Sequence, residues 1–101
     1  MAITTVGPAE VVSVHKSTYE VLDEKREMVV IRVRDHTDSK NKSKAPETIL
    51  YASMSDPGAE ELLDLKPGTK LSAICRIEPS SDASDDYLEL WILGISVLKE
   101  D

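Results

Sequence analysis

Aromatic residues and cysteine are scarce in this chain. Its 101 residues include no phenylalanine, three tyrosines and one tryptophan, so the core must be aliphatic and each aromatic ring becomes more informative. The one cysteine, Cys75, excludes an intramolecular disulfide and a thiolate zinc site. It lies in a run that alternates with Leu71, Ala73 and Ile77, which predicts a small buried side chain rather than a reactive thiol.

Long apolar runs are also missing. No segment approaches the roughly 20 apolar residues that span a bilayer, and residues 1–6 lack the basic and apolar regions of a signal peptide. We therefore expect a cytoplasmic protein with no membrane partner.

The residue patterns of common active sites are absent as well. His15 and His36 have no spacing that would hold a metal, and the glycines are scattered rather than gathered in a phosphate-binding loop. The adjacent carboxylates, Glu60 with Glu61 and Asp85 with Asp86, are typical of acids exposed to solvent. We expect no catalytic residue, no metal site and no cofactor, and hence a protein that is not an enzyme.

The charge is acidic overall but unevenly placed. The formal net charge is −7, which argues against a protein that neutralises duplex DNA over a wide surface. Residues 1–50 hold eight basic and eight acidic residues, whereas residues 51–101 hold four and eleven. Between residues 32 and 44 there are five basic and two acidic residues, so a local positive site on an acidic body is expected.

The organising segment is residues 28–36, which alternates as a strand does. One face carries the aliphatic side chains of Val29, Ile31 and Val33. The other face carries Arg32 and Arg34. The segment therefore predicts a strand with one face in the core and a cationic face outside it.

The remaining elements follow from alternation and from turn residues. Residues 1–8 are expected to be a flexible N-terminal arm, residues 9–98 a single domain, and residues 99–101 a C-terminal end. We predict a bulge near residues 15–17 and a bulge or bend at Gly94. The predicted strands are residues 9–22, 27–36, 48–54, 69–78 and 87–98, with a short helix at residues 59–65.

Five strands with a helix between the third and fourth resemble the OB-fold, a partly open Greek-key barrel. The turn at residues 65–71, Leu-Lys-Pro-Gly-Thr-Lys-Leu, is similar to the entry into the fourth strand of many such domains. The predicted class is all-β, an OB-fold-like five-stranded barrel with one short helix; a small β-sandwich fragment or another small barrel is the alternative. The chain also resembles, in architecture, the small single-stranded DNA-binding proteins.

This resemblance implies binding of single-stranded nucleic acid, most simply single-stranded DNA, in replication, repair or mobile-element maintenance. Such proteins join a positive groove to aromatic faces on which bases stack. The candidate phosphate contacts are Arg32, Arg34, Lys40, Lys42 and Lys44, and the candidate stacking rings are Tyr51 and Trp91.

Each candidate also has a structural interpretation. The two arginines can keep a sheet face solvated or pair with acids such as Glu47 and Glu89, and the lysine segment can be a simple polar loop. Trp91 can pack under the first strand, form a subunit interface or stack on a base. The alternative function is therefore an OB-fold subunit for protein interaction or oligomerisation, using an apolar face around Trp91.

Overall fold

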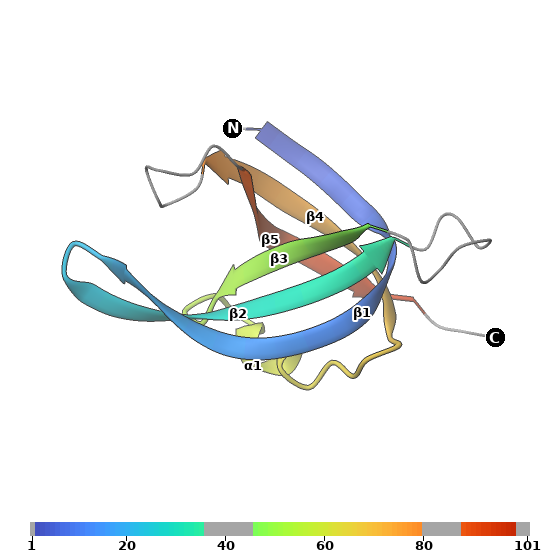
Figure 1. Cartoon of the computed structure of the whole chain (residues 1–101), viewed down its shortest axis with the longest axis horizontal. Coiled ribbons are helices and arrows are strands. Elements are labelled where there is room, and N and C mark those ends of the chain that lie inside the picture. The colour runs from blue at the N-terminus through green and yellow to red at the C-terminus, as the bar shows by residue number, and fades with distance from the viewer. Residues whose placement is uncertain (1, 36–45, 80–87, 99–101) are drawn as a thin grey trace.

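The computed structural model describes residues 2–35, 46–79 and 88–98 (Figure 1). Strands dominate these residues, as the alternating sequence predicts. In chain order the elements are β1 (Ala2–Val21), β2 (Glu24–Asp35), β3 (Glu47–Ser53), α1 (Ala59–Leu62), β4 (Lys70–Pro79) and β5 (Leu88–Val97).

The five strands close into a ring in the order β1-β2-β3-β5-β4, with β4 returning to β1. All neighbouring strands are antiparallel except β3 and β5, which are parallel. The prediction of an all-β, OB-fold-like five-stranded barrel with one short helix between the third and fourth strands is confirmed.

The core fills the inside of the ring and is aliphatic. Val29, Ile31 and Val33 of β2 are buried, as is Cys75 of β4, which confirms the predicted inward faces of both strands. Full burial of one such aliphatic side chain contributes about 1.5 to 3 kcal/mol to folding. The buried cluster consists of Ala9, Val11, Val29, Ile31, Val33, Leu50, Ala52, Ala59, Leu71, Ala73 and Cys75.

The N-terminal residues differ from the prediction of a flexible arm. Residues Ala2 to Val6 are the first part of β1, and they pair with β4 from Ile77 to Ala73. The sequence has little apolar content here, but backbone hydrogen bonds to β4 hold the segment, because closing the ring gives that strand a second neighbour.

Gly7 lies at the irregularity between Val6 and Ala9 that interrupts the pairing of β1 with β4, just before β1 also begins to pair with β2. Its φ of +125° is one that residues with a side chain rarely adopt. A Cβ atom there would lie 2.8 Å from the backbone oxygen of Leu71 and from the Cα of Ser72. Glycine is therefore required both by the backbone conformation and by the close approach of β4.

A bulge in β1 sets which side chains face outward. The register with β2 shifts between Val11 and Ser13, earlier than the predicted bulge near residues 15–17. Beyond it Ser13 pairs with Arg32, so the odd-numbered residues of β1 share the arginine face. Tyr19 is among them.

The β1–β2 hairpin projects beyond the other strands (Figure 1). Val21 pairs with Glu24 at its end, leaving Leu22 and Asp23 as a two-residue turn. Both have positive φ, at 50° and 65°, and Leu22 is 94% exposed. This turn has the backbone conformation that asparagine and glycine prefer.

The ring is not evenly closed, because β3 and β5 share a very short seam. They pair only at Leu50 with Leu90 and at Tyr51 with Trp91. In β5 the register with β4 shifts at Leu93, next to Gly94, which confirms the predicted bulge or bend. Past this short seam, the β3 side of β5 has no strand partner within the described residues.

The helix is shorter than predicted. α1 spans Ala59–Leu62, and the next three residues continue as a turn in which each N–H donates to the carbonyl three residues earlier. Ala59 is buried in the core, and Leu62 and Leu65 pack against it. The α1 segment therefore packs its apolar side chains against the core of the barrel.

Candidate nucleic-acid interface

The two arginines of β2 share one carboxylate. Arg32 Nε lies 3.6 Å from Glu47 Oε2, and Arg34 Nη2 donates to Glu47 Oε1 at 3.4 Å. The register places Arg34 directly opposite Glu47 across β2 and β3. Pairing with Glu47, one of the two acids considered from the sequence, is thus observed, and it leaves one positive charge in excess among the three groups.

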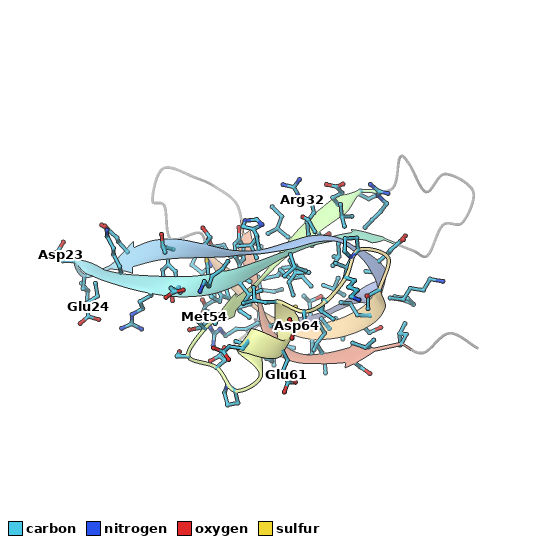
Figure 2. The ribbon with its side chains drawn as sticks, turned by 90° about the horizontal axis from the view of Figure 1, so that it is seen from below. Asp23, Glu24, Arg32, Met54, Glu61 and Asp64 are labelled. Atoms are coloured by element: carbon cyan, nitrogen blue, oxygen red, sulfur yellow. The ribbon has the colours of Figure 1, made fainter. Side chains whose placement is uncertain are left out.

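These three side chains remain accessible. Arg32 is 50% exposed, Arg34 32% and Glu47 37%. Figure 2 shows Arg32 on the opposite side of the barrel from the acids Glu61 and Asp64 near α1. A cationic stretch therefore exists on an otherwise acidic molecule.

Three aromatic rings meet at the seam, and we call them the aromatic cluster: Tyr19, Tyr51 and Trp91. The Tyr51 and Trp91 ring centroids lie 5.4 Å apart with planes 31° apart. Tyr19 meets Trp91 edge-on, with centroids 6.0 Å apart and planes at 63°. Trp91 therefore contacts rings from both β1 and β3.

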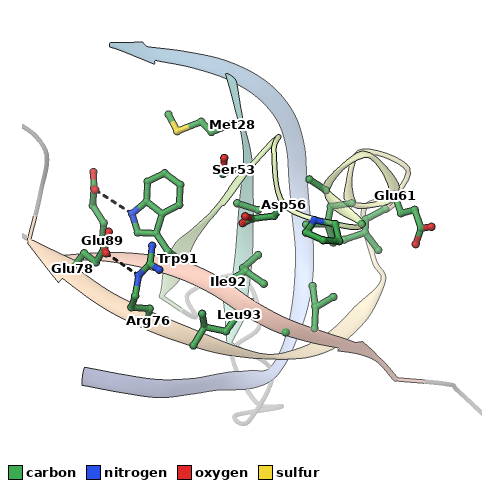
Figure 3. A pocket seen from close by; sticks show the side chains of 18 of the residues that line it. Met28, Ser53, Asp56, Glu61, Arg76, Glu78, Glu89, Trp91, Ile92 and Leu93 are labelled. Atoms are coloured by element: carbon green, nitrogen blue, oxygen red, sulfur yellow. Dashed lines mark hydrogen bonds and ion pairs between the residues drawn. The ribbon is translucent and has the colours of Figure 1, made fainter. Parts of the chain in front are cut away.

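Two features position the cluster. The parallel register places Tyr51 beside Trp91, and the curved β1–β2 hairpin brings Tyr19 across to β5. The Trp91 indole Nε1–H donates to Glu89 Oε1 at 3.3 Å, and Glu89 is only 9% exposed (Figure 3). This hydrogen bond satisfies the polar edge of a half-buried ring.

A hollow of about 1060 Å³ opens beside the cluster, where the β3–β5 seam ends. The hairpin, β5 and the segment around α1 form its walls. Figure 3 shows Arg76 and Trp91 at one end, Met28 above them, and Glu61 at the other end. The hollow thus has an aromatic end and an acidic end.

Two further arginines lie at the aromatic end. Arg26 projects from the hairpin opposite Tyr19, and Arg76 lies opposite Trp91 on β4. Each pairs with a nearby acid: Arg26 Nη2 with Glu24 Oε2 at 3.4 Å, and Arg76 Nε with Glu78 Oε1 at 2.7 Å. Both side chains are partly exposed, so both guanidiniums are within reach of a ligand.

The structure brings four of the predicted residues onto one face of the sheet: Arg32, Arg34, Tyr51 and Trp91. Arg32 pairs with Ile49, two residues from Tyr51 along β3, and Tyr51 contacts Trp91. The predicted loop residues Lys40, Lys42 and Lys44 lie outside the described residues.

Sequence reasoning missed Tyr19, Arg26 and Arg76 as members of this face. For Arg76 the outward parity of β4 was a usable signal. Tyr19 and Arg26 depend on the curvature of a hairpin, which alternation alone does not report.

The described part of the chain offers little support for a metal site or a reactive thiol. No three His, Cys, Asp or Glu side chains there gather closely enough to hold a metal ion. Burial raises the pKa of the Cys75 thiol, so the neutral form is favoured. None of the helical structure in residues 2–35, 46–79 and 88–98 is long and apolar enough to cross a membrane.

Comparison of the chain with protein-family models, with curated proteins and with solved structures finds no significant match. Arguments about function therefore rest on the geometry of this chain alone.

Proposed function

We propose that this chain is a non-enzymatic, cytoplasmic protein of the OB-fold type that binds single-stranded nucleic acid, most simply single-stranded DNA. Its setting would be replication, repair or the maintenance of a mobile element. The observation that carries the proposal is the aromatic cluster, with arginines on both sides of it.

The position of the cluster supports this function. In OB-folds the ligand lies over strands two and three, between the loops that join strands one to two and four to five. Here Tyr51 lies on β3, and the β1–β2 hairpin curves over to place Tyr19 against Trp91. A base stacked on such a ring contributes about 1 to 3 kcal/mol.

The pairing of the arginines with acids is a small obstacle. Exposed ion pairs contribute about 0 to 1 kcal/mol, because water screens them and both side chains lose freedom. Glu47 also serves two guanidiniums at 3.4 and 3.6 Å. The free energy lost when a phosphate displaces Glu47 is therefore within the range that one stacked base supplies. The ion pairs with Glu47 modulate binding rather than prevent it.

A titration with labelled oligothymidylate of about 15 nucleotides tests the proposal. Fluorescence anisotropy at low salt is expected to rise with protein concentration, and the affinity to fall steeply as salt increases. Replacing Arg26 and Arg76 with alanine is expected to lower the slope of log affinity against log salt by about 0.7 for each lost phosphate contact.

Lys66→Ala is the matched control, because it removes an exposed positive charge from the turn after α1, outside the hollow. It is expected to leave the affinity within about twofold. Equal effects of Lys66→Ala and of the arginine substitutions would contradict this site.

The second candidate is a subunit for protein interaction or oligomerisation. Leu93 and Val97 of β5 are each 50% exposed and line the hollow, which favours an apolar partner there. Salt separates the two functions, because an apolar contact weakens little as salt rises whereas phosphate contacts weaken steeply.

A further inference from the structure

One edge of β5 is open. Residues Leu88 to Val97 pair with β4 along the whole strand, whereas β3 pairs only with Leu90 and Trp91. Within the described residues, the remaining length from Ile92 to Val97 has no backbone partner on the β3 side. Every second residue of an antiparallel strand directs its N–H and C=O away from its partner, so this edge presents unpaired hydrogen-bonding groups.

Open edges are usually protected by lysine, by proline or by a covering element, because they recruit other strands. Residues 92–97, Ile-Leu-Gly-Ile-Ser-Val, contain neither lysine nor proline. At Gly94 a Cβ would meet nothing within 4 Å, so its lack of a side chain relieves no contact inside the chain. Glycine within a strand often marks a place where another backbone approaches closely.

The hollow runs along this edge. Ile92, Leu93, Gly94, Ile95 and Val97 all line it. Leu62 and Leu65 from the α1 segment line it as well. An extended segment laid along the edge would therefore find apolar side chains to pack against, as well as backbone groups to pair with.

The charge beside the edge indicates the partner. Asp56 lies midway along the hollow and Glu61 at its far end (Figure 3), and within the described residues neither makes an ion pair. We propose that the open edge of β5 accepts an extended, basic and apolar segment of a partner protein as an added strand. Lysine or arginine of that segment would meet Asp56 and Glu61, and its backbone would pair with residues 92–97.

Other occupants fit less well. A second copy that paired through its own β5 would bring no positive charge, because residues 88–97 contain no lysine or arginine. Nucleic acid is disfavoured at this end, because Asp56 and Glu61 repel phosphate. The inference is thus independent of the nucleic-acid function, which uses the aromatic end.

The test uses a capped hexapeptide of alternating lysine and valine, long enough to cover residues 92–97. At about 1 mM it is expected to bind and to slow amide hydrogen exchange in this segment. A glutamate–valine peptide and an N-methylated lysine–valine peptide are expected not to bind, the first because of its charge and the second because it cannot complete the ladder.

Asp56→Lys is expected to weaken binding of the basic peptide about fivefold or more. The Asp56 side chain caps no amide of the helix, so the change leaves α1 intact. Glu60→Lys is the matched control, because Glu60 lies on α1 but not along the hollow, and it is expected to change the affinity less than twofold.

Three results would overturn the proposal. The first is that the basic peptide fails to bind, or binds no better than the acidic one. The second is that exchange in residues 92–97 slows as the concentration of the protein alone rises, which would assign the edge to a second copy. The third is that oligothymidylate alone protects these amides and displaces the peptide. If the protein binds the basic peptide but does not bind oligothymidylate, only the nucleic-acid function is refuted.

Discussion

Neutralising Glu47 should strengthen binding of single-stranded nucleic acid. In Glu47→Gln the carboxylate that holds Arg32 and Arg34 becomes a neutral amide, and both guanidiniums are released toward a ligand. Substitutions within a binding site usually weaken binding, so a gain in affinity would be a distinctive result. The site is partly exposed, and the stability of the fold should fall by no more than about 1 kcal/mol, the value of the two surface ion pairs that are lost.

The magnitude follows from the geometry. The two contacts, at 3.6 and 3.4 Å, join side chains that are 32% to 50% exposed. At about 0.5 kcal/mol for each such surface pair, their loss amounts to about 1 kcal/mol. Since about 1.4 kcal/mol corresponds to a tenfold change, the affinity should rise about fivefold at low salt.

Glu27→Gln provides the control for this measurement. Like Glu47→Gln it removes one negative charge, but this charge lies on β2. Glu27 pairs with Lys16, with Lys16 Nζ 2.9 Å from Glu27 Oε2. Anisotropy titrations of both variants with the same oligothymidylate should show tighter binding and a steeper salt dependence for Glu47→Gln only. Equal affinities of the two variants would refute the role assigned to Arg32 and Arg34.

Three further predictions concern stability. Gly7→Ala should lower the free energy of unfolding by about 2 kcal/mol or more, because the new Cβ meets the β4 backbone at a positive φ, whereas Gly94→Ala should leave it unchanged or slightly raised in the same urea titrations. Leu22→Asn should raise the melting temperature through a gain of about 1 kcal/mol, because asparagine tolerates the positive φ of this exposed turn; a lower melting temperature would contradict this reasoning. Burial raises the pKa of Cys75 in the folded state, so wild type should lose stability relative to Cys75→Ala as pH rises from about 7 to about 10, where the unfolded thiol ionises first; a constant difference would contradict this.

Strand alternation predicted the barrel well because inward faces bury aliphatic side chains at every second position. Val29, Ile31 and Cys75 lie in the core for this reason. The N-terminal segment was predicted wrongly, because residues Ala2 to Val6 gain their order from backbone pairing with β4, and backbone groups leave no pattern in the sequence.

The candidate site was predicted less completely. Tyr51 and Trp91 were identified from strand parity together with the OB-fold resemblance, and the register does bring their rings together. Tyr19 joins them because of the bulge at Val11/Ser13 and the curvature of the hairpin, neither of which alternation could locate. Pairing of the arginines with Glu47 was one interpretation of the sequence, but the sharing of this one carboxylate by both guanidiniums depends on side-chain geometry.

Trp91 allows a direct measurement of stacking, because it is the one tryptophan in the chain. Its emission can be followed while unlabelled oligothymidylate is added at low salt. Saturable quenching that is reversed by added salt is expected if bases stack on the indole between Tyr19 and Tyr51. Emission that stays constant up to high oligonucleotide concentration would contradict binding at the aromatic cluster.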